Sequence, residues 1–398
     1  MAATRVGVIG AGIVGLAVAR RLGAVESGIE LTVLDKENQV GVHQTGHNSG
    51  VAHAGVYYTP GSLKAKLCRR GIELLKPYCE ERGIPYDECG KLIVARDADE
   101  IARLDEIERR GVANGVLGLK RLGSSEMVEI EPNVRGVAAL HSPATAIVDF
   151  PAVARAYADD ARAAGGSLRL GYEVAAIDRL GGEIRVRSTA GEELAFDRLV
   201  VCGGLYSDRL AQMAGEGREP WIVPFRGEYY KLVPERRELV KGLIYPVPDP
   251  AYPFLGVHFT RRVDGGVDIG PNAVLAFKRE GYRRADFSAP DLLDVLRSQG
   301  FRRLARKHWR MGAQEMWGSL SKRAFVARAR DFIPALTTAD VEPAPAGVRA
   351  QALDPDGSLV DDFRITNVGG LVLVRNAPSP AATSSLAIAE YVVDQLRD

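Results

Sequence analysis

A glycine-rich turn near the amino terminus constrains the fold of this chain more than any other feature of its sequence. The segment Gly10-Ala-Gly-Ile-Val-Gly15 matches the pattern G-x-G-x-x-G and separates an apolar run at 5–9 from a stretch with helical apolar spacing at 13–25. Asp35 follows a second apolar run at 30–34. This order predicts strand, helix and strand, the Rossmann-type βαβ unit of α/β proteins that binds the adenosine diphosphate half of a dinucleotide.

The glycines of this turn have distinct expected roles. Gly10 permits the tight turn, Gly12 lets the backbone approach the pyrophosphate, and Gly15 lets the helix pack closely on the strand. Asp35 is expected to accept a hydrogen bond from a ribose hydroxyl. A glycine turn without a ligand is the alternative, but strand, helix and acidic residue are all in place. The motif does not distinguish NAD from FAD, because both carry the same adenosine diphosphate half.

Length and charge narrow the class of protein further. A chain of 398 residues with 46% hydrophobic residues predicts two associated domains. The 52 basic and 51 acidic residues nearly cancel, which argues against a nucleic-acid partner and favours a small-molecule substrate. The four cysteines include no CxxC pair, so we expect reduced thiols.

The amino terminus shows no targeting signal. Met1 is followed almost at once by the first predicted strand, without a signal peptide or an amphipathic transit sequence, so a cytoplasmic location is expected. The sequence contains no run of 18 apolar residues, and we therefore expect no membrane-spanning helix. Peripheral association with a membrane stays open.

Patterning along the rest of the chain predicts a discontinuous arrangement of domains. Helices are expected at 61–82, 98–114 and 151–164, and strands at 184–188, 197–204 and 370–374. Between 220 and 345 the composition shifts to aromatic residues, which predicts a mainly antiparallel sheet that lines a pocket, and 342–347 resembles a linker. The expected nucleotide-binding domain comprises 1–85, 145–219 and 346–398, and the expected second domain comprises 86–144 and 220–345.

A hydrophilic block at 43–64 follows the predicted nucleotide-binding unit. It contains three of the six histidines, His43, His47 and His53, together with small residues and two adjacent tyrosines. A loop of this length and composition is more often functional than a simple connector. A solvated loop and a metal site are the alternatives. We expect no metal, because no carboxylate or cysteine lies among these histidines.

Three segments carry a resemblance to a known family. HQTGHNSGVAHAGVYYTPGSLKA at 43–65, PFLGVHFTRR at 253–262 followed by GPNAVLAFKREGY at 270–282, and NAPSPAATSSLAI at 376–388 resemble the L-2-hydroxyglutarate dehydrogenases and oxidases. The resemblance extends over essentially the whole chain. That family belongs to the D-amino acid oxidase superfamily, which implies FAD bound by a Rossmann domain and a substrate domain built on a mostly antiparallel sheet.

The resemblance also implies which residues bind the cofactor. They form the pyrophosphate turn, the adenosine end, the stretch along the middle of the flavin, a strand residue near adenine, a second glycine turn, and a loop at the isoalloxazine ring. In that order they are Gly10, Gly12, Ile13, Val14, Gly15; Asp35, Lys36; Gln44, Thr45, Asn48, Ser49, Gly50; Val174; Cys202, Gly203, Gly204; and Asn376, Pro378, Ser379, Ala381, Ala382, Thr383. For the last two groups, a strand end and a helix cap are the structural alternatives.

Oxidation of a 2-hydroxy acid requires a base for the hydroxyl proton and a cation for the carboxylate. His258 is the first candidate for the base, since alternation in the strand expected at 254–260 places it on one face with Phe254 and Thr260, and His53 is the second. Arg349 resembles the arginine of the superfamily's G-x-R block and is the candidate anchor. Further candidate partners for a substrate with two carboxylates are Tyr57, Tyr58, Lys231, Arg261 and Arg262, with Thr260 beside them.

The resemblance therefore implies oxidation of L-2-hydroxyglutarate to 2-oxoglutarate, with FAD as the immediate acceptor and oxygen or a membrane quinone as the final one. Oxidation of an amine or amino acid on the same fold is the nearest alternative. A flavin-binding sensor without turnover and an NAD-dependent dehydrogenase are two others. The sequence leaves the final acceptor, covalent attachment of the flavin and the oligomeric state open.

Overall fold

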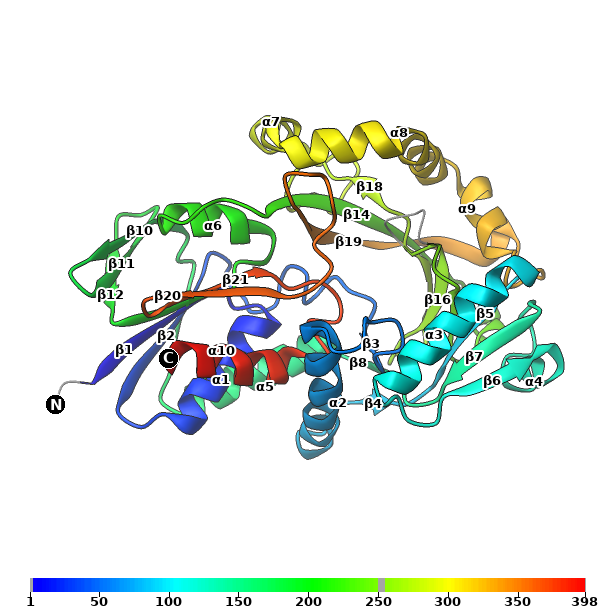
Figure 1. The fold of residues 1–398 in the computed structure, drawn as a ribbon, viewed down its shortest axis with the longest axis horizontal. Coiled ribbons are helices and arrows are strands. Elements are labelled where there is room, and N and C mark those ends of the chain that lie inside the picture. Colours follow the sequence, from blue (N-terminus) through cyan, green and yellow to red (C-terminus); the bar gives the residue numbers. More distant parts are fainter. Residues whose placement is uncertain (1–2, 250–254, 398) are drawn as a thin grey trace.

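The computed structural model describes residues 3–249 and 255–397 and contains two large sheets (Figure 1). The first has six strands in the order β20-β21-β13-β1-β2-β9, all parallel except the β20–β21 pair. Their bounds are β1 Thr4–Ile9, β2 Ile29–Asp35, β9 Ser167–Leu170, β13 Arg198–Val201, β20 Arg364–Val368 and β21 Leu371–Asn376. The βαβ unit predicted from the glycine turn is confirmed, with α1 at Ile13–Val25 between β1 and β2.

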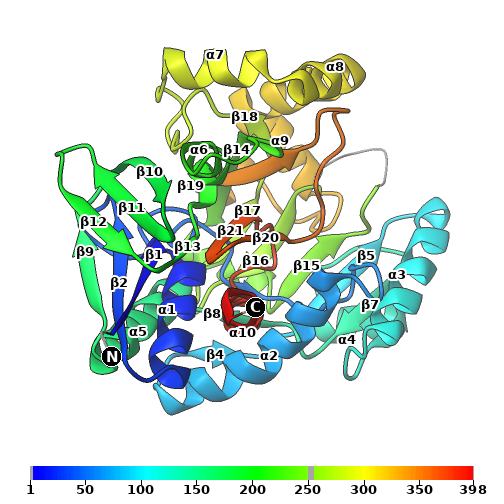
Figure 2. The ribbon, with the colours of Figure 1, turned by 60° about the vertical axis from the view of Figure 1, so that its left-hand side comes forward.

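Both faces of this parallel sheet are covered, as the burial of apolar side chains on both faces requires. Val6 and Val8 pack against helices α1, α5 and α10 on one face. Ile9 packs on the other face, against helix α6 and a three-stranded sheet whose place beside β1 and β2 is visible in Figure 2. The bounds of the covering elements are α5 Phe150–Ala163, α6 Ser207–Met213, α10 Ser385–Arg397, β10 Val174–Leu180, β11 Glu183–Ser188 and β12 Glu193–Phe196.

The second large sheet has nine strands and is mostly antiparallel, which confirms the prediction for this part of the chain. Its order is β18-β14-β17-β16-β15-β5-β7-β6, with β19 also paired to β14, and only the β15–β5 pair is parallel. The bounds are β5 Lys91–Ala95, β6 Lys120–Gly123, β7 Ala138–Ser142, β14 Trp221–Leu232, β15 Leu243–Pro246, β16 His258–Arg261, β17 Val267–Gly270, β18 Val274–Leu275 and β19 Val341–Leu353. Phe254, at the start of the strand expected at 254–260, lies outside the described residues.

The prediction of a linker at 342–347 was wrong, because these residues belong to β19. That strand pairs with β14 from Val341 opposite Leu232 to Leu353 opposite Trp221. Pro343 and Pro345 suggested a linker, but proline is compatible with a strand where its missing N–H is not needed for the ladder. A domain boundary was also expected between 345 and 346. Strand β19 runs without interruption across this position.

Three helices were not expected between 220 and 345. Helices α7 Ala289–Arg297, α8 Gln299–Leu320 and α9 Lys322–Ala329 follow one another, and Figure 2 shows α7 and α8 above β14 and β18. Each helix begins after a serine whose side chain accepts a hydrogen bond from the first turn: Ser288, Ser298 and Ser321. Serine caps of this kind are a sequence signal for helix starts, so these helices could have been predicted.

The helices expected at 61–82, 98–114 and 151–164 are confirmed to within three residues at each end. Helix α2 is capped by the Ser62 hydroxyl and is followed by Gly83, whose φ is +63°. The other bounds are α2 Leu63–Glu81, α3 Ile101–Ala113, α4 Ser124–Ile130, β3 Val51–Ala52, β4 Tyr86–Asp87 and β8 Ala146–Val148. No helix in the described part of the chain is long and apolar enough to cross a membrane.

Candidate functional site

A cavity of about 780 Å³ lies between the two large sheets, at the carboxyl ends of β1, β2 and β13. This is where open parallel sheets bind ligands, and the volume lies toward the upper end of the usual range for small-molecule sites, about 300–1,000 Å³. The cavity extends from Asp35 and Val174 at one end to His258 and Arg349 at the other.

The glycine turn has the geometry of a phosphate cradle. A Cβ atom on Gly10, whose φ is +107°, would lie 2.3 Å from the carbonyl oxygen of Cys202, and one on Gly15 would lie 1.9 Å from that of Gly10. These two positions require glycine because strand, turn and helix pack so closely. At Gly12 the nearest neighbour would be the Thr45 hydroxyl at 3.6 Å, so this backbone faces open space in the cavity.

Nearly all the cofactor-binding residues expected from the sequence line this cavity. The exception is Gly50, which forms a turn with φ +71° behind the wall and donates its N–H to Asn48. Those on the wall are Gly10, Gly12, Ile13, Val14, Gly15, Asp35, Lys36, Gln44, Thr45, Asn48, Ser49, Val174, Cys202, Gly203, Gly204, Asn376, Pro378, Ser379, Ala381, Ala382 and Thr383. Segments far apart in the sequence thus meet along one surface.

Asp35 already accepts two backbone hydrogen bonds, from Ala11 N at 2.6 Å and Glu37 N at 2.9 Å. A carboxylate has about four lone-pair sites, so Asp35 can also accept from a ribose hydroxyl. The side chain of Asn376 donates to the carbonyl oxygens of Val360 and Asp362, both at 2.9 Å. Asn376 therefore holds its loop in place with its side chain.

Lys36, beside the adenosine end, lies among two carboxylates. Its Nζ is 2.5 Å from Glu37 and 2.9 Å from Glu280, and the ring of His43 contacts the same two acids. Burial lowers the pKa of His43, but Glu280 and Glu37 outweigh burial and raise it overall. The prediction of no metal was based on the histidine block alone and did not take these acids into account. Glu37, His43 and Glu280 have metal-ligand proximity, but the Lys36 ammonium already supplies a positive charge between the two carboxylates.

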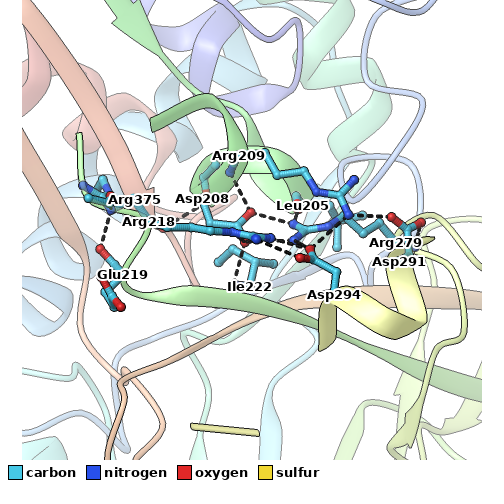
Figure 3. Close-up of polar contacts among 12 residues, drawn as sticks. Leu205, Asp208, Arg209, Arg218, Glu219, Ile222, Arg279, Asp291, Asp294 and Arg375 are labelled. Atoms are coloured by element: carbon cyan, nitrogen blue, oxygen red, sulfur yellow. Dashed lines mark hydrogen bonds and ion pairs between the residues drawn. The ribbon is translucent and has the colours of Figure 1, made fainter. Parts of the chain in front are cut away.

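A buried network of ion pairs supports the second glycine turn (Figure 3). Arg279, 1% exposed, pairs with Asp208 at 2.6 Å and Asp294 at 3.1 Å, and it also donates to the carbonyl oxygen of Leu205. Arg218 joins the same two acids. The network connects α6 and the turn at 203–206 to helix α7. Helix α7 was not part of the site expected from the sequence.

At the far end of the cavity, a buried histidine, a half-buried histidine and an arginine share the wall: His258, His53 and Arg349. The Nδ1 of His258 lies 2.9 Å from the carbonyl oxygen of Gly256, which can only accept, so in the neutral ring Nδ1 carries the proton and Nε2 keeps its lone pair. Burial, together with the charges of Arg349 and Lys91, lowers the pKa of His258 to about 3. Burial and the charges of Lys91, His258 and Lys64 lower the pKa of His53 to about 3 as well.

The neighbours of these groups connect three segments. The ring of Tyr245 packs against that of His258, with centroids 4.0 Å apart and the planes tilted by 32°. Arg349, in β19, lies next to the hydroxyl of Tyr229 in β14. The Nε2 of His53 lies 3.3 Å from the Ser379 hydroxyl. The backbone N–H of His53 donates to the Thr383 hydroxyl, so the histidine block is held against the loop at 376–383.

A family model described as "FAD dependent oxidoreductase" matches residues 5–395. L-2-hydroxyglutarate dehydrogenases align with 98% of this chain: the mitochondrial protein of Homo sapiens is 48% identical with 88% of its length covered, and the Escherichia coli K12 protein is 44% identical with 92% covered. The chain belongs to this family.

Solved structures support the same fold. L-alpha-glycerophosphate oxidase from Mycoplasma pneumoniae, a structure with FAD bound, has a TM-score of 0.80 at 22% identity, covering 100% of this chain and 96% of the other. Glycine oxidase from Geobacillus kaustophilus has a TM-score of 0.73 at 19% identity, covering 99% and 95%. FAD is the cofactor of this L-2-hydroxyglutarate dehydrogenase family member, and the open backbone at Gly12 and the length of the cavity fit it.

Several substrate-binding candidates do not line the cavity of this family member. Lys231 lies away from it: its side chain is 45% exposed and pairs at 3.1 Å with Glu342, the residue opposite it in β19. Arg261 pairs with Asp87 and Arg262 with Asp268, at 3.3 and 3.6 Å. Tyr57, Tyr58 and Thr260 lie behind the wall, where Thr260 neighbours Tyr245.

The sequence analysis missed two lysines near this end of the dehydrogenase cavity. Lys64 lines it and pairs with Asp361 at 2.7 Å. Lys91 begins the otherwise apolar strand β5 and is 1% exposed. A lysine adjoining a wholly apolar strand was the signal available for Lys91, since lysine is almost never fully buried without a partner.

Proposed function

We propose that this chain oxidises L-2-hydroxyglutarate to 2-oxoglutarate. The observation that carries the proposal is a neutral histidine with a free Nε2 lone pair and an arginine on one wall of the cavity: His258 and Arg349. Bound FAD would supply the acceptor for the hydride that leaves the alpha carbon. The hydroxyl proton goes to Nε2 of His258, and the carbon–oxygen bond becomes a carbonyl, so that one proton and one hydride leave the substrate.

Binding of the substrate prepares the base. Arg349 holds the carboxylate beside the reacting carbon by charge-assisted hydrogen bonds, each worth about 1.5–3 kcal/mol. The pKa of His258, lowered to about 3 by burial and nearby cations, rises when an anionic substrate approaches, because a negative charge favours the imidazolium form. His53 is the second candidate base, with its own lowered pKa and its contact to Ser379.

For the cofactor, we assign the glycine turn and Asp35 to the adenosine diphosphate half. The segment 44–49 would lie along the middle of the flavin and the loop 376–383 at its ring. Free backbone N–H groups in that loop, ahead of α10, can stabilise negative charge on the reduced ring. Val174 and Cys202–Gly204 would complete the wall.

Anaerobic titration of the purified protein with each enantiomer of 2-hydroxyglutarate, while flavin absorbance is recorded, tests the proposal. Bleaching by the L enantiomer supports it. Bleaching by glycine or sarcosine, with none by 2-hydroxyglutarate, would overturn it in favour of amine oxidation. Colourless protein that binds NAD would overturn the flavin assignment as well.

We propose oxygen or a membrane quinone as the final electron acceptor. The chain would act in the cytoplasm and reach a quinone from the inner face of a membrane as a peripheral protein. Rates of reoxidation of the reduced protein by dissolved oxygen and by a soluble quinone distinguish the two acceptors. We further propose that the two large sheets belong to separate domains, a division that limited proteolysis can test.

A further inference from the structure

Lys91 is a buried cation without an acidic partner among the residues that the structure describes. It is 1% exposed, and its Nζ forms neither an ion pair nor a hydrogen bond within 3–249 and 255–397. Its contacts are with two aromatic rings: Nζ lies 4.6 Å from the centre of the Tyr57 ring and 5.1 Å from that of Tyr245. Ring faces attract a cation, but they do not replace its hydration as a carboxylate would.

One of the two rings that contact Lys91 also lines the cavity, next to the candidate base. Tyr245 lines the cavity and packs against His258, with 4.0 Å between the ring centroids. The hydroxyl of Tyr57 is buried and has no hydrogen-bond partner in the described part of the chain. Behind the wall that holds the candidate base, the Lys91 ammonium therefore lies over the ring of Tyr57, and neither the ammonium nor the Tyr57 hydroxyl has a hydrogen-bond partner among the described residues. Buried donors without acceptors are costly and rare, and such groups are candidates for ligand binding.

Every other basic side chain considered for this end of the cavity has a recorded partner. Lys64 pairs with Asp361, Lys231 with Glu342, and Arg261 with Asp87. Arg262 donates to the carbonyl oxygen of Asn48 at 2.8 Å. The proposed substrate carries two carboxylates, and Arg349 can neutralise only the one next to the reacting carbon.

We propose that Lys91, together with the hydroxyl of Tyr57, binds the distal carboxylate of the substrate and so selects 2-hydroxydicarboxylates over 2-hydroxymonocarboxylates. This inference rests on the proposed function. The flexible four-carbon stem of lysine allows Nζ to move past the Tyr245 ring toward the cavity. Burial lowers the pKa of Lys91 to about 7, and an arriving carboxylate would favour the charged form.

Substrate discrimination tests the inference. For each protein, kcat/KM is measured with L-2-hydroxyglutarate and with L-2-hydroxybutyrate, which lacks the distal carboxylate, and the ratio is compared. Lys91→Met is expected to lower this ratio about 10- to 100-fold, as loss of a charge-assisted contact requires. Lys91→Arg should retain most of it, and Tyr57→Phe should lower it less than Lys91→Met. The matched control Lys231→Met, at an exposed lysine of the same sheet, should leave it unchanged.

A binding measurement separates recognition from turnover. Glutarate and butyrate, neither of which can be oxidised, are titrated into the FAD-loaded protein, and the perturbation of the flavin spectrum gives each Kd. The unchanged protein should bind glutarate more tightly than butyrate, and Lys91→Met should remove the difference.

The outcomes separate the two proposals. If the unchanged protein is not reduced by L-2-hydroxyglutarate, the proposed function fails. If it is reduced, but the ratio and the glutarate preference survive in Lys91→Met, the assignment of Lys91 alone fails. An equal loss for both substrates would also overturn it, since that indicates a structural role. Should Lys91→Met not retain FAD, an unchanged ratio in Tyr57→Phe would overturn the proposal.

Discussion

Arg279 and Lys91 are both 1% exposed, yet the regions around them differ in kind. Arg279, between α6 and α7, pairs with Asp208 and Asp294 and donates to the backbone at Leu205. Lys91, behind the aromatic end of the cavity, contacts the rings of Tyr57 and Tyr245 and has no acidic partner in the described part of the chain. Figure 3 shows how completely the first cation is surrounded by acids.

The presence or absence of acidic partners distinguishes a buried charge that stabilises the fold from one that is available to a ligand. A buried charge with matched partners connects the elements that supply them, and breaking the set leaves partners unpaired. A buried charge without partners lowers the stability of the folded chain until a ligand arrives. The network around Arg279 should therefore govern stability, and the end of the cavity near Lys91 and His258 should govern activity.

His258→Ala should have the largest effect, and on activity alone. The rate of flavin reduction by L-2-hydroxyglutarate is expected to fall about 10²- to 10⁴-fold, because a positioned base contributes that much. Stopped-flow absorbance measures the rate, and the flavin content of the purified variant shows that FAD remains bound. Near-normal reduction would assign the base to His53, for which His53→Ala is the companion variant.

Arg279→Met should lower the stability of the folded protein. Removal of Arg279 leaves the buried Asp208 with Arg218, at 3.2 Å, in place of two arginines, so the free energy of unfolding should fall by about 3–5 kcal/mol. Urea unfolding followed by circular dichroism measures it. Arg109→Met is the matched control, since Arg109 pairs with Glu106 on the surface with 66% of its side chain exposed, and no measurable loss of stability is expected there. A loss at Arg279 no larger than the control would contradict the structural role.

Lys91→Met should change stability in the opposite direction. At pH 6 the ammonium is charged in both states, and its replacement is expected to raise the free energy of unfolding by about 1–3 kcal/mol. Burial lowers the pKa of Lys91 from 10.5 to about 7. Between these values the unfolded chain binds the extra proton, so the stability of the unchanged protein rises with pH and the gain shrinks. Urea unfolding at pH 6, 8 and 10 checks this, and a difference independent of pH would refute it.

Lys231→Met should have the smallest effect. Its side chain is half-exposed and pairs with Glu342 outside the cavity, so kcat/KM for L-2-hydroxyglutarate should stay within about two-fold. Steady-state kinetics measure it. A ten-fold loss would return Lys231 to the substrate site and weaken the contrast between the two regions.

Patterns confined to short segments were predictable from the sequence. The turn at Gly10–Gly15, Asp35 at the end of β2, and helix α2 ahead of Gly83 depend on local backbone geometry and on apolar periodicity. The residues expected to bind the cofactor line one cavity, except Gly50, which lies behind its wall. The linker at 342–347 was misread, because its pairing with β14 is a contact with residues more than one hundred positions away.

The sequence by itself determined the Rossmann unit, the class of cofactor through its motifs, and the histidines and arginine worth considering. Only the tertiary structure decided which cations are paired. Lys231 and Lys91 cannot be told apart by residue type, but β14 turns the first toward Glu342 and solvent, while β5 buries the second against Tyr57 and Tyr245. The physical reason is that the energy of a charge depends on its surroundings, and these come from segments distant in the chain.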